Sequence, residues 1–276
     1  MPAVEPRRDP AGSDLDLLAS AAKEAGAVAL TFFRRNPANW MKENDSPVSD
    51  ADIAVDRLLT ERLRAARPDY GWLSEETIDD ASRRSGRPVF IVDPIDGTRE
   101  FLAGRNEWAV SIAVVVGGRP VAAVLAVPAL RETFTASAGG GVWLNGAPIA
   151  VAKRADLAGA KVAGPRRYVR RLAEKAGIDI RAVRFIGSLA YRLALVAAGR
   201  VDVGVAREGA RDWDLAAADL IVHEAGGKLA DLEGRVLRYD RADTRHPTIV
   251  AAPVEVAGEV RRLIAAEVAV FDLGQG

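Results

Sequence analysis

Six consecutive residues, Asp93-Pro94-Ile95-Asp96-Gly97-Thr98, constrain this chain more than any other stretch. They follow an apolar run at residues 89–92, whose β-branched and aromatic side chains are typical of a buried strand ending in a tight turn. Because Pro94 restricts one backbone angle and Gly97 adopts conformations that other residues avoid, the two aspartates can converge outside the strand end. Hard divalent cations prefer such oxygen ligands. The N–H groups of Gly97 and Thr98 would begin a short helical turn, where a phosphate binds readily.

An ordinary surface turn is the alternative interpretation, because Asp, Pro and Gly are also the usual turn residues. A shorter piece such as Asp-Gly-Thr alone would indicate a hairpin. The complete string behind a buried strand is more specific, and we interpret it as a metal site beside a phosphate site.

The composition is that of an ordinary globular protein and leaves carboxylates as the main chemical groups. Of 276 residues, 49% are hydrophobic and 28% are charged, which favours one large domain or two closely joined ones. The 38 basic residues balance the 38 acidic ones, so no overall field attracts a nucleic acid polymer or an anionic membrane. The chain has no cysteine and only two histidines, which excludes thiolate ligands and disfavours a zinc site.

The first residues show no targeting signal. Residues 1–12 lack an apolar core, so we expect a disordered tail and neither a signal peptide nor an anchor. No apolar run reaches membrane-spanning length, and with the absence of cysteine this favours a cytoplasmic protein. The remainder is expected to divide into an N-terminal α+β part at 13–150 and a C-terminal α/β part at 151–276, packed as one unit.

Apolar periodicity predicts the elements of both parts. In the first part we expect helices at 13–36 and 50–67, strands at 70–73 and 89–92, and an antiparallel meander of strands at 108–116, 120–127 and 131–136. In the second part we expect strands at 161–163, 183–186, 201–206 and 248–251, and helices at 166–176, 188–198, 212–225 and 253–268. The alternation of strands and helices in the second part is typical of α/β structure.

The six-residue string resembles the signature of the inositol monophosphatase superfamily, which includes 3'(2'),5'-bisphosphate nucleotidases, fructose-1,6-bisphosphatases and some histidinol phosphatases. The resemblance covers about residues 13–270. It implies an α+β fold of layered α-β-α-β-α type, with an antiparallel sheet in the N-terminal part. Homodimers are common in the superfamily, although no residue of the chain identifies an interface.

Two further acidic stretches resemble signatures of the same superfamily. Adjacent glutamates at a strand end are usually solvated charges, but the resemblance makes Glu75 of Glu75-Glu76 a metal ligand. Ser74 stands where Gly normally precedes this pair. Aspartates at a helix start are usually caps. The resemblance of Trp-Asp-Xaa-Ala-Ala to a third signature instead makes Asp214 a ligand, whereas Asp212 is expected to be a cap.

The resemblance also assigns catalytic and phosphate-binding roles. Capping of the second helix explains Asp50, but residues 48–52 resemble the segment whose aspartate orients the attacking water, so Asp52 is expected to be catalytic. The Thr98 hydroxyl is expected to be its partner. The N–H groups of Gly97 and Thr98 are expected to bind the phosphate oxygens.

Two or three Mg²⁺ ions are implied by the resemblance. Glu75, Asp93 and the main-chain carbonyl of Ile95 are expected to hold one ion. Asp93, Asp96 and Asp214 are expected to hold a second, and relatives commonly bind a third, weaker ion near Glu75. Four clustered carboxylates repel one another, so the site should depend on the metal.

Arginines after the motif bear on the substrate. Arg99-Glu100-Phe101 follows the motif where inositol monophosphatases usually have Thr-Asn-Phe, so Arg99 stands at the position of Thr, and this segment resembles bacterial bisphosphate nucleotidases. A second phosphate requires further guanidinium groups. Arg166, Arg167 and Arg192 are candidates, although the favoured interpretation of each one taken alone is a solvated surface arginine.

A second departure from the inositol monophosphatase pattern lies seven residues before Asp214. Where those enzymes present a glutamate to the sugar hydroxyls, this chain has Arg207, with Glu208 next to it. Glu208 therefore stays a candidate substrate contact, because one residue of slippage would restore the carboxylate.

The sequence thus predicts a Mg²⁺-dependent phosphomonoesterase in which metal-activated water attacks phosphorus in line. The leading hypothesis is a 3'(2'),5'-bisphosphate nucleotidase that converts adenosine 3',5'-bisphosphate to AMP and phosphate. An inositol or histidinol monophosphate phosphatase is the alternative within the superfamily. A binding or regulatory protein with a vestigial site is the alternative from another class. Relatives are commonly inhibited by Li⁺, so some lithium sensitivity is expected.

Overall fold

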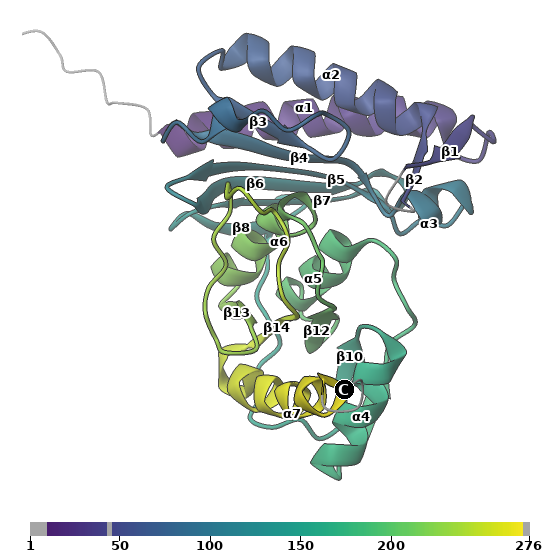
Figure 1. Cartoon of the computed structure of the whole chain (residues 1–276), viewed down its shortest axis with the longest axis vertical. Coiled ribbons are helices and arrows are strands. Elements are labelled where there is room, and N and C mark those ends of the chain that lie inside the picture. The colour runs from purple at the N-terminus through teal and green to yellow at the C-terminus, as the bar shows by residue number, and fades with distance from the viewer. Residues whose placement is uncertain (1–9, 43–45, 273–276) are drawn as a thin grey trace, which may run out of the picture.

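The computed structural model describes residues 10–42 and 46–272, which form five stacked layers. In Figure 1 a pair of helices covers a first sheet, a second pair lies between this sheet and a second one, and a third pair covers the far face. The α-β-α-β-α layering expected from the sequence is confirmed. Within the described ranges, no helix is both long enough and apolar enough to cross a membrane.

The N-terminal half forms the first two layers. Its long helices are α1 (Pro10–Phe32) and α2 (Asp50–Ala66). A separate antiparallel pair consists of β1 (Asn39–Met41) and β2 (Pro47–Ser49). The strands of the first sheet are β3 (Gly71–Ser74), β4 (Val89–Asp96), β5 (Ala109–Val116), β6 (Arg119–Val127), β7 (Glu132–Ser137), β8 (Gly141–Leu144) and β9 (Ala147–Pro148). The short helix α3 (Thr98–Leu102) follows β4.

The strands of the first sheet lie in sequence order from β3 to β9. β3 is parallel to β4, and all other neighbours are antiparallel, so the expected meander of β5, β6 and β7 is confirmed. The register of β4 against β5 shifts between Asp93 and Asp96. Such an irregularity re-aims side chains at a strand end, and here it lies within the acidic motif.

The C-terminal half supplies the other three layers. Helices α5 (Leu189–Ala197) and α6 (Asp212–Glu224) form the central layer. The second sheet has the order β11 (Ile180–Ala182), β10 (Ala160–Ala163), β12 (Val203–Ala206), β14 (Ile249–Pro253) and β13 (Gly227–Asp231). Its first three strands are parallel, and the last two pair antiparallel. Helices α4 (Arg166–Ala176) and α7 (Val254–Asp272) cover its far face.

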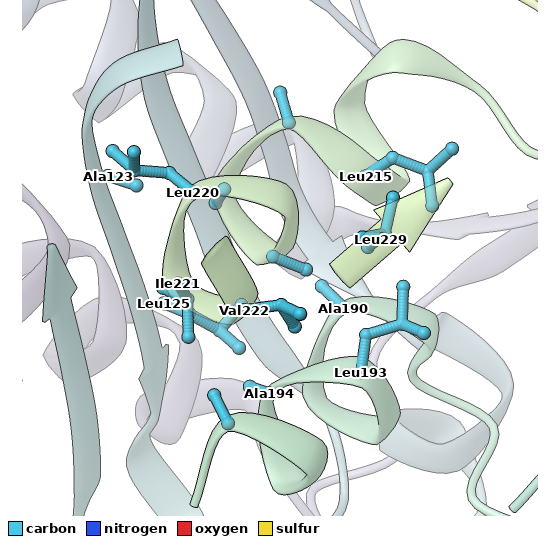
Figure 2. Close-up of a cluster of buried hydrophobic side chains, with 14 of the residues drawn as sticks. Ala123, Leu125, Ala190, Leu193, Ala194, Leu215, Leu220, Ile221, Val222 and Leu229 are labelled. Atoms are coloured by element: carbon cyan, nitrogen blue, oxygen red, sulfur yellow. The ribbon is translucent and has the colours of Figure 1, made fainter. Parts of the chain in front are cut away.

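Three hydrophobic clusters hold the layers together. Alternate residues of β4 face opposite clusters: Phe90 packs beneath α1 and α2, whereas Ile91 faces α5 and α6. Strands covered on both faces are apolar on both, which explains the continuous run before the motif. Figure 2 shows side chains of the central cluster from α5 and α6 against the two sheets: Ala123, Leu125, Ala190, Leu193, Ala194, Leu215, Leu220, Ile221, Val222 and Leu229. This cluster draws on both halves of the chain, and the third lies beneath α4 and α7.

Several element ends differ from the sequence-based expectations. α1 begins at Pro10, so residues 10–12 form its first turn, whereas residues 1–9 of the expected tail lie outside the described residues. β4 continues through Asp96, because Asp93 and Asp96 still pair with β5. The strands at β1, β2 and β13 were not expected, since none shows a strong apolar alternation.

The prediction of a strand at residues 183–186 was wrong. The parallel partner of β10 is β11, at Ile180–Ala182. Val183 N still donates to Val162 O, at 2.9 Å, and the chain then leaves the sheet toward α5. Phe185 and Ile186 therefore do not pair in a sheet: Ile186 packs in the central cluster, and Phe185 is exposed.

Candidate active site

A cleft of about 250 Å³ opens where β4 ends and the first turns of α3 and α6 begin. It brings together residues that lie far apart in the sequence, including four of the expected metal-binding carboxylates. The lining residues are Ser46, Pro47, Glu75, Asp93, Ile95, Asp96, Gly97, Thr98, Arg99, Glu100, Phe185, Gly187 and Asp214.

Asp93 lies at the centre of the acidic group. Its side chain is buried, and its Oδ1 atom has no hydrogen-bond partner within the described part of the chain. Burial raises its pKa well above the usual range, and the nearby negative charges of Glu75, Asp96 and Asp214 raise it further. A buried carboxylate oxygen without a donor is energetically costly unless something else satisfies it.

Asp96 links the motif to the start of α5. Its Oδ2 accepts hydrogen bonds from Ser188 Oγ at 2.5 Å and from Ala190 N at 2.7 Å, and its Oδ1 accepts one from Leu189 N at 3.1 Å. Burial raises the pKa of Asp96 to about 6, although these three hydrogen bonds stabilise its charged form. The carboxylate is therefore fixed in place by the central helix layer.

Asp214 lies in the first turn of α6, where its Oδ2 accepts a hydrogen bond from Arg211 N at 2.7 Å. Its pKa is raised well above the usual range by burial and by the charges of Asp96 and Glu75. Asp212, expected to cap this helix, instead accepts hydrogen bonds from His246 Nε2 and Asp240 N. The prediction that Asp212 caps α6 was therefore wrong. The N-cap residue is Arg211, and the carboxylate that accepts from its backbone N–H belongs to Asp214, three residues later.

A cation fits this arrangement. One carboxylate oxygen from each of Asp93, Asp96 and Asp214 lies within 4.8 Å of the others. Three carboxylates at this separation raise one another's pKa, and an oxygen-rich group of this kind is the environment that Mg²⁺ or Ca²⁺ prefers. Asp93 Oδ1, which lacks a hydrogen-bond donor among the described residues, independently indicates a cation site.

Glu75 faces the same cleft from the end of β3 but is not within that group of three. It accepts hydrogen bonds from Lys42 Nζ at 3.0 Å and Ser46 Oγ at 3.4 Å, and Lys42 also donates to Glu76 at 2.6 Å. Burial raises the pKa of Glu76 to about 7. The Ser74 hydroxyl donates to Asp56 Oδ1 at 2.5 Å and so secures the turn before Glu75.

Thr98 and Asp52 are in contact, as the sequence predicts. Thr98 Oγ1 lies 3.0 Å from Asp52 Oδ1 and 3.1 Å from the Ile95 carbonyl oxygen. Asp52 Oδ2 accepts hydrogen bonds from Ser49 N at 2.9 Å and from Ser49 Oγ at 2.6 Å, at the start of α2. The helix-capping and catalytic interpretations of Asp52 are therefore compatible. Burial raises its pKa.

Gly97 joins the motif to α3 in a left-handed conformation, with φ = 91°. A Cβ atom at this position would lie 3.1 Å from the backbone of Ser188. The absence of a side chain therefore allows the beginnings of α3 and α5 to approach each other closely beside the carboxylates.

A second cavity of about 390 Å³ adjoins the cleft and shares Asp96, Arg99, Phe185, Gly187 and Asp214 with it. Arg192, Arg207 and Glu208 also line this cavity. Arg192 is 5% exposed, and its Nε has no hydrogen-bond partner among the described residues, while its Nη1 donates to Ile186 O at 3.1 Å. Burial lowers its pKa to about 10, so it stays cationic at neutral pH.

Two of the expected substrate-binding arginines lie elsewhere. Arg166 and Arg167 are exposed on α4 and line neither cavity. Ser188 and Lys42 contact the acidic residues but were not expected from the sequence. Ser188 could have been noticed as a residue before a helix, but nothing in the sequence indicates that it donates to Asp96.

The chain resembles known proteins over nearly its whole length. The model of the inositol monophosphatase family matches residues 14–269. A protein named Nus factor SuhB from Xylella fastidiosa is 34% identical over 261 residues, covering 91% of this chain and 94% of the relative. A histidinol-phosphatase from Chlorobaculum parvum is 36% identical, covering 80% and 87%. The solved structure of an IMPase from Thermotoga maritima superposes with a TM-score of 0.82 at 28% identity, covering 93% of this chain and 98% of that one.

Proposed function

Because the chain belongs to the inositol monophosphatase family and is a hydrolase of phosphoric monoesters, we propose that its substrates are small metabolites with two phosphates. The specific reaction we propose is that of a Mg²⁺-dependent 3'(2'),5'-bisphosphate nucleotidase, which converts adenosine 3',5'-bisphosphate to AMP and phosphate. The observation that carries this proposal is the juxtaposition of an acidic cluster with a buried, incompletely satisfied guanidinium in adjoining cavities.

The acidic residues are proposed to hold the metal. Asp93, Asp96 and Asp214 would bind one ion, and Glu75, Asp93 and the Ile95 carbonyl another, with two or three ions in all. When bound, Mg²⁺ offsets the repulsion between an anionic phosphate ester and its nucleophile and acidifies water. The hydrogen bonds of Asp96 from the start of α5 keep its carboxylate in position without the metal.

Thr98 and Asp52 are proposed to take the proton of the attacking water. Thr98 Oγ1 donates toward Asp52 Oδ1, which leaves its oxygen free to accept a hydrogen bond from water. As the water loses its proton to Thr98 Oγ1, the Thr98 proton can pass to Asp52. Ser49 holds the other carboxylate oxygen, so Asp52 keeps its orientation throughout. The N–H groups of Gly97 and Thr98 are proposed to bind the phosphate oxygens.

The second phosphate is proposed to bind in the adjoining cavity. The Nε–H group of Arg192 has no acceptor among the residues that the structure describes, and a buried donor of this kind favours an anionic ligand. Arg99 and Arg207 line the same cavity, so a second phosphate would meet several guanidinium groups. Glu208 also lines it and could accept from a sugar hydroxyl.

Phosphate release from a panel of esters tests this proposal. With Mg²⁺ we expect kcat/KM for adenosine 3',5'-bisphosphate to exceed that for inositol 1-phosphate and histidinol phosphate by at least about tenfold. One additional hydrogen bond to a charged group provides enough binding free energy for a difference of this size. Arg192→Lys should raise KM for the bisphosphate more than for the monophosphates, because an ammonium lacks the planar fork of a guanidinium. Arg170→Ala, an exposed change on α4, is the matched control.

Two other functions have specific support. The similarity to a named histidinol-phosphatase favours a monophosphate substrate, and a preference for histidinol phosphate or inositol 1-phosphate in the panel would replace our proposal. The similarity to a protein named Nus factor favours a binding role. If no ester released phosphate while the intact chain bound a macromolecular partner, the binding role would be the better description.

A further inference from the structure

Phe185 presents an aromatic ring to the substrate cleft. It is 50% exposed, and it lines both the cleft at the carboxylates and the adjoining cavity. A phenyl ring gains about 1.5–3 kcal/mol from complete burial, so half-exposure leaves part of this stabilisation unrealised. A substrate ring that covered Phe185 would complete the burial.

The backbone around Phe185 is held at several points. Val183 N donates to Val162 O before it, and Ile186 O accepts from Arg192 Nη1 after it. At Gly187 a Cβ atom would lie 2.3 Å from Glu100 Oε1, so the chain passes close against the wall of the cleft. These contacts fix the position from which the Phe185 ring extends, and the ring is therefore part of a preformed wall.

The surroundings of the ring suit a planar, electron-rich group. The Arg192 guanidinium carbon lies 5.4 Å from the ring centroid of Phe185. Pro165 and Leu189 contribute apolar surface to the same cavity, while Arg99 and Arg207 contribute positive charge. An aromatic wall beside cationic groups provides both stacking and charge attraction.

We propose that Phe185 is a specificity-determining residue that stacks against the nucleobase of the substrate. The inference rests on the proposed nucleotidase function, and it names the part of the substrate that the carboxylates and arginines do not contact. A base has a π-face that stacks on a phenyl ring. An inositol ring is saturated and has no π-face, so it cannot form the same stacking contact. Phe185 therefore favours a nucleoside bisphosphate over a sugar phosphate.

Kinetics of three Phe185 variants with Mg²⁺ test this role. Phe185→Leu removes the ring but keeps an apolar side chain, Phe185→Ala removes both, and Phe185→Trp keeps an aromatic surface. Base stacking on an aromatic side chain corresponds to a loss of roughly 5- to 150-fold on its removal. We expect KM for adenosine 3',5'-bisphosphate to rise by about tenfold in Phe185→Ala and Phe185→Leu and to change less than about threefold in Phe185→Trp. kcat/KM for inositol 1-phosphate should be unchanged in all three.

A second measurement keeps this inference separate from the proposed reaction. AMP carries a base and one phosphate, and its binding in the presence of Mg²⁺ can be measured by calorimetry without any turnover. If the wild-type chain hydrolyses no bisphosphate but binds AMP, and Phe185→Leu weakens that binding about tenfold, the reaction is wrong and the stacking role stands.

Equal losses for adenosine 3',5'-bisphosphate and inositol 1-phosphate in Phe185→Leu would overturn the stacking role, since they indicate a structural effect on the cleft. Unchanged KM and unchanged AMP affinity would overturn it as well. Val236→Ala, which shortens an equally exposed apolar side chain remote from both cavities, controls for effects of surface hydrophobicity.

Discussion

A single carboxylate, Asp93, is destabilised by its buried, acidic surroundings, and a bound cation would relieve this electrostatic repulsion. Its unpartnered Oδ1 and its raised pKa follow from burial beside three other carboxylates. Asp93→Asn removes one negative charge from this group. We therefore expect the metal-free variant to be more stable than the wild type by about 1 kcal/mol, or about 2–4 °C in Tm. The stabilisation by Mg²⁺ should largely disappear, and phosphatase activity should fall by at least about a thousandfold.

Asp212→Asn is the matched control for Asp93→Asn. Asp212 is also fully buried, but its oxygens accept hydrogen bonds from His246 and Asp240 N. The same chemical change should lower Tm here and leave the Mg²⁺-dependent shift intact. Thermal unfolding with Mg²⁺ and with a chelator measures both effects. A lower metal-free Tm in Asp93→Asn would contradict the account of strain at the carboxylates.

The sequence predicted which carboxylates lie together better than it predicted the contacts that orient them. Asp93, Asp96 and Asp214 could be identified because each belongs to a distinctive local string, and they do lie together. The donors that orient them could not be identified. Ser188 approaches Asp96 only through the packing of α5 against the strand end, and this contact spans 92 positions. Such contacts depend on tertiary packing and leave no local pattern.

At the scale of elements, the start of α2 is coupled to the start of α3. Asp52 accepts from Ser49 at the helix terminus with one oxygen and from Thr98 with the other. Substitution can separate the structural contact of Asp52 with Ser49 from its proposed catalytic contact with Thr98. Thr98→Val removes the hydroxyl with little change of shape, and we expect kcat to fall about 10²- to 10⁴-fold with KM nearly unchanged. Stability should fall by about 1–3 kcal/mol, because a buried Asp52 oxygen loses its donor. Steady-state kinetics and thermal unfolding of one preparation measure these quantities.

Ser49→Ala is the complementary variant. It removes the hydroxyl that donates to Asp52 at 2.6 Å but leaves Thr98 in place. The expected result is a loss of about 1.5–3 kcal/mol in stability, as for other hydrogen bonds to charged groups, with a much smaller fall in kcat than in Thr98→Val. If Thr98→Val lowered Tm but left kcat intact, the contact would be structural only.

Most helices and sheet strands could be predicted because their periodicity is imposed by two buried faces. α2 and α4 match their expected ranges closely, and Phe90 and Ile91 alternate between two cores. The failure at residues 183–186 has a physical cause. Val183, Phe185 and Ile186 predict a strand from local pattern alone, but the chain there turns toward α5 and leaves Phe185 exposed at the cleft. Val183 and Ile186 pack against the central hydrophobic cluster, so their apolar character reflects core packing and not sheet pairing.

At the scale of the whole molecule, the cleft joins the two halves of the chain across the layers. Asp93 and Asp96 belong to the first sheet, whereas Asp214 and the donors to Asp96 belong to the central helices. The repulsion between these carboxylates therefore acts between layers, and a cation bound there should stabilise the entire fold. Global unfolding is for this reason a suitable measure of metal binding.

The pH dependence of stability follows from the same charges. The pKa values of Asp96, about 6, and Glu76, about 7, lie above the ordinary values of these groups. The folded, metal-free protein therefore binds more protons than the unfolded chain, and its stability is greatest below about pH 4 for these groups and falls as pH rises through 6–7. For Asp96 the shift from 3.8 to about 6 corresponds to roughly 3 kcal/mol. We expect the chelated protein to lose on the order of 5–10 °C in Tm between pH 5 and pH 7.5.

Mg²⁺ should remove the part of this loss that comes from Asp96, because a bound cation takes the place of its proton, whereas Glu76 does not line the cleft. His223 has a raised pKa and loses its stabilising contribution in the same direction, but it lies outside the cleft and should not respond to Mg²⁺. Asp243, with a pKa of about 2, titrates below the range tested. The difference in Tm with and without Mg²⁺ thus isolates the carboxylates. It should grow from pH 5 to pH 7.5 and vanish in Asp93→Asn, whereas a difference that shrank with rising pH would show that the carboxylates do not bind the metal.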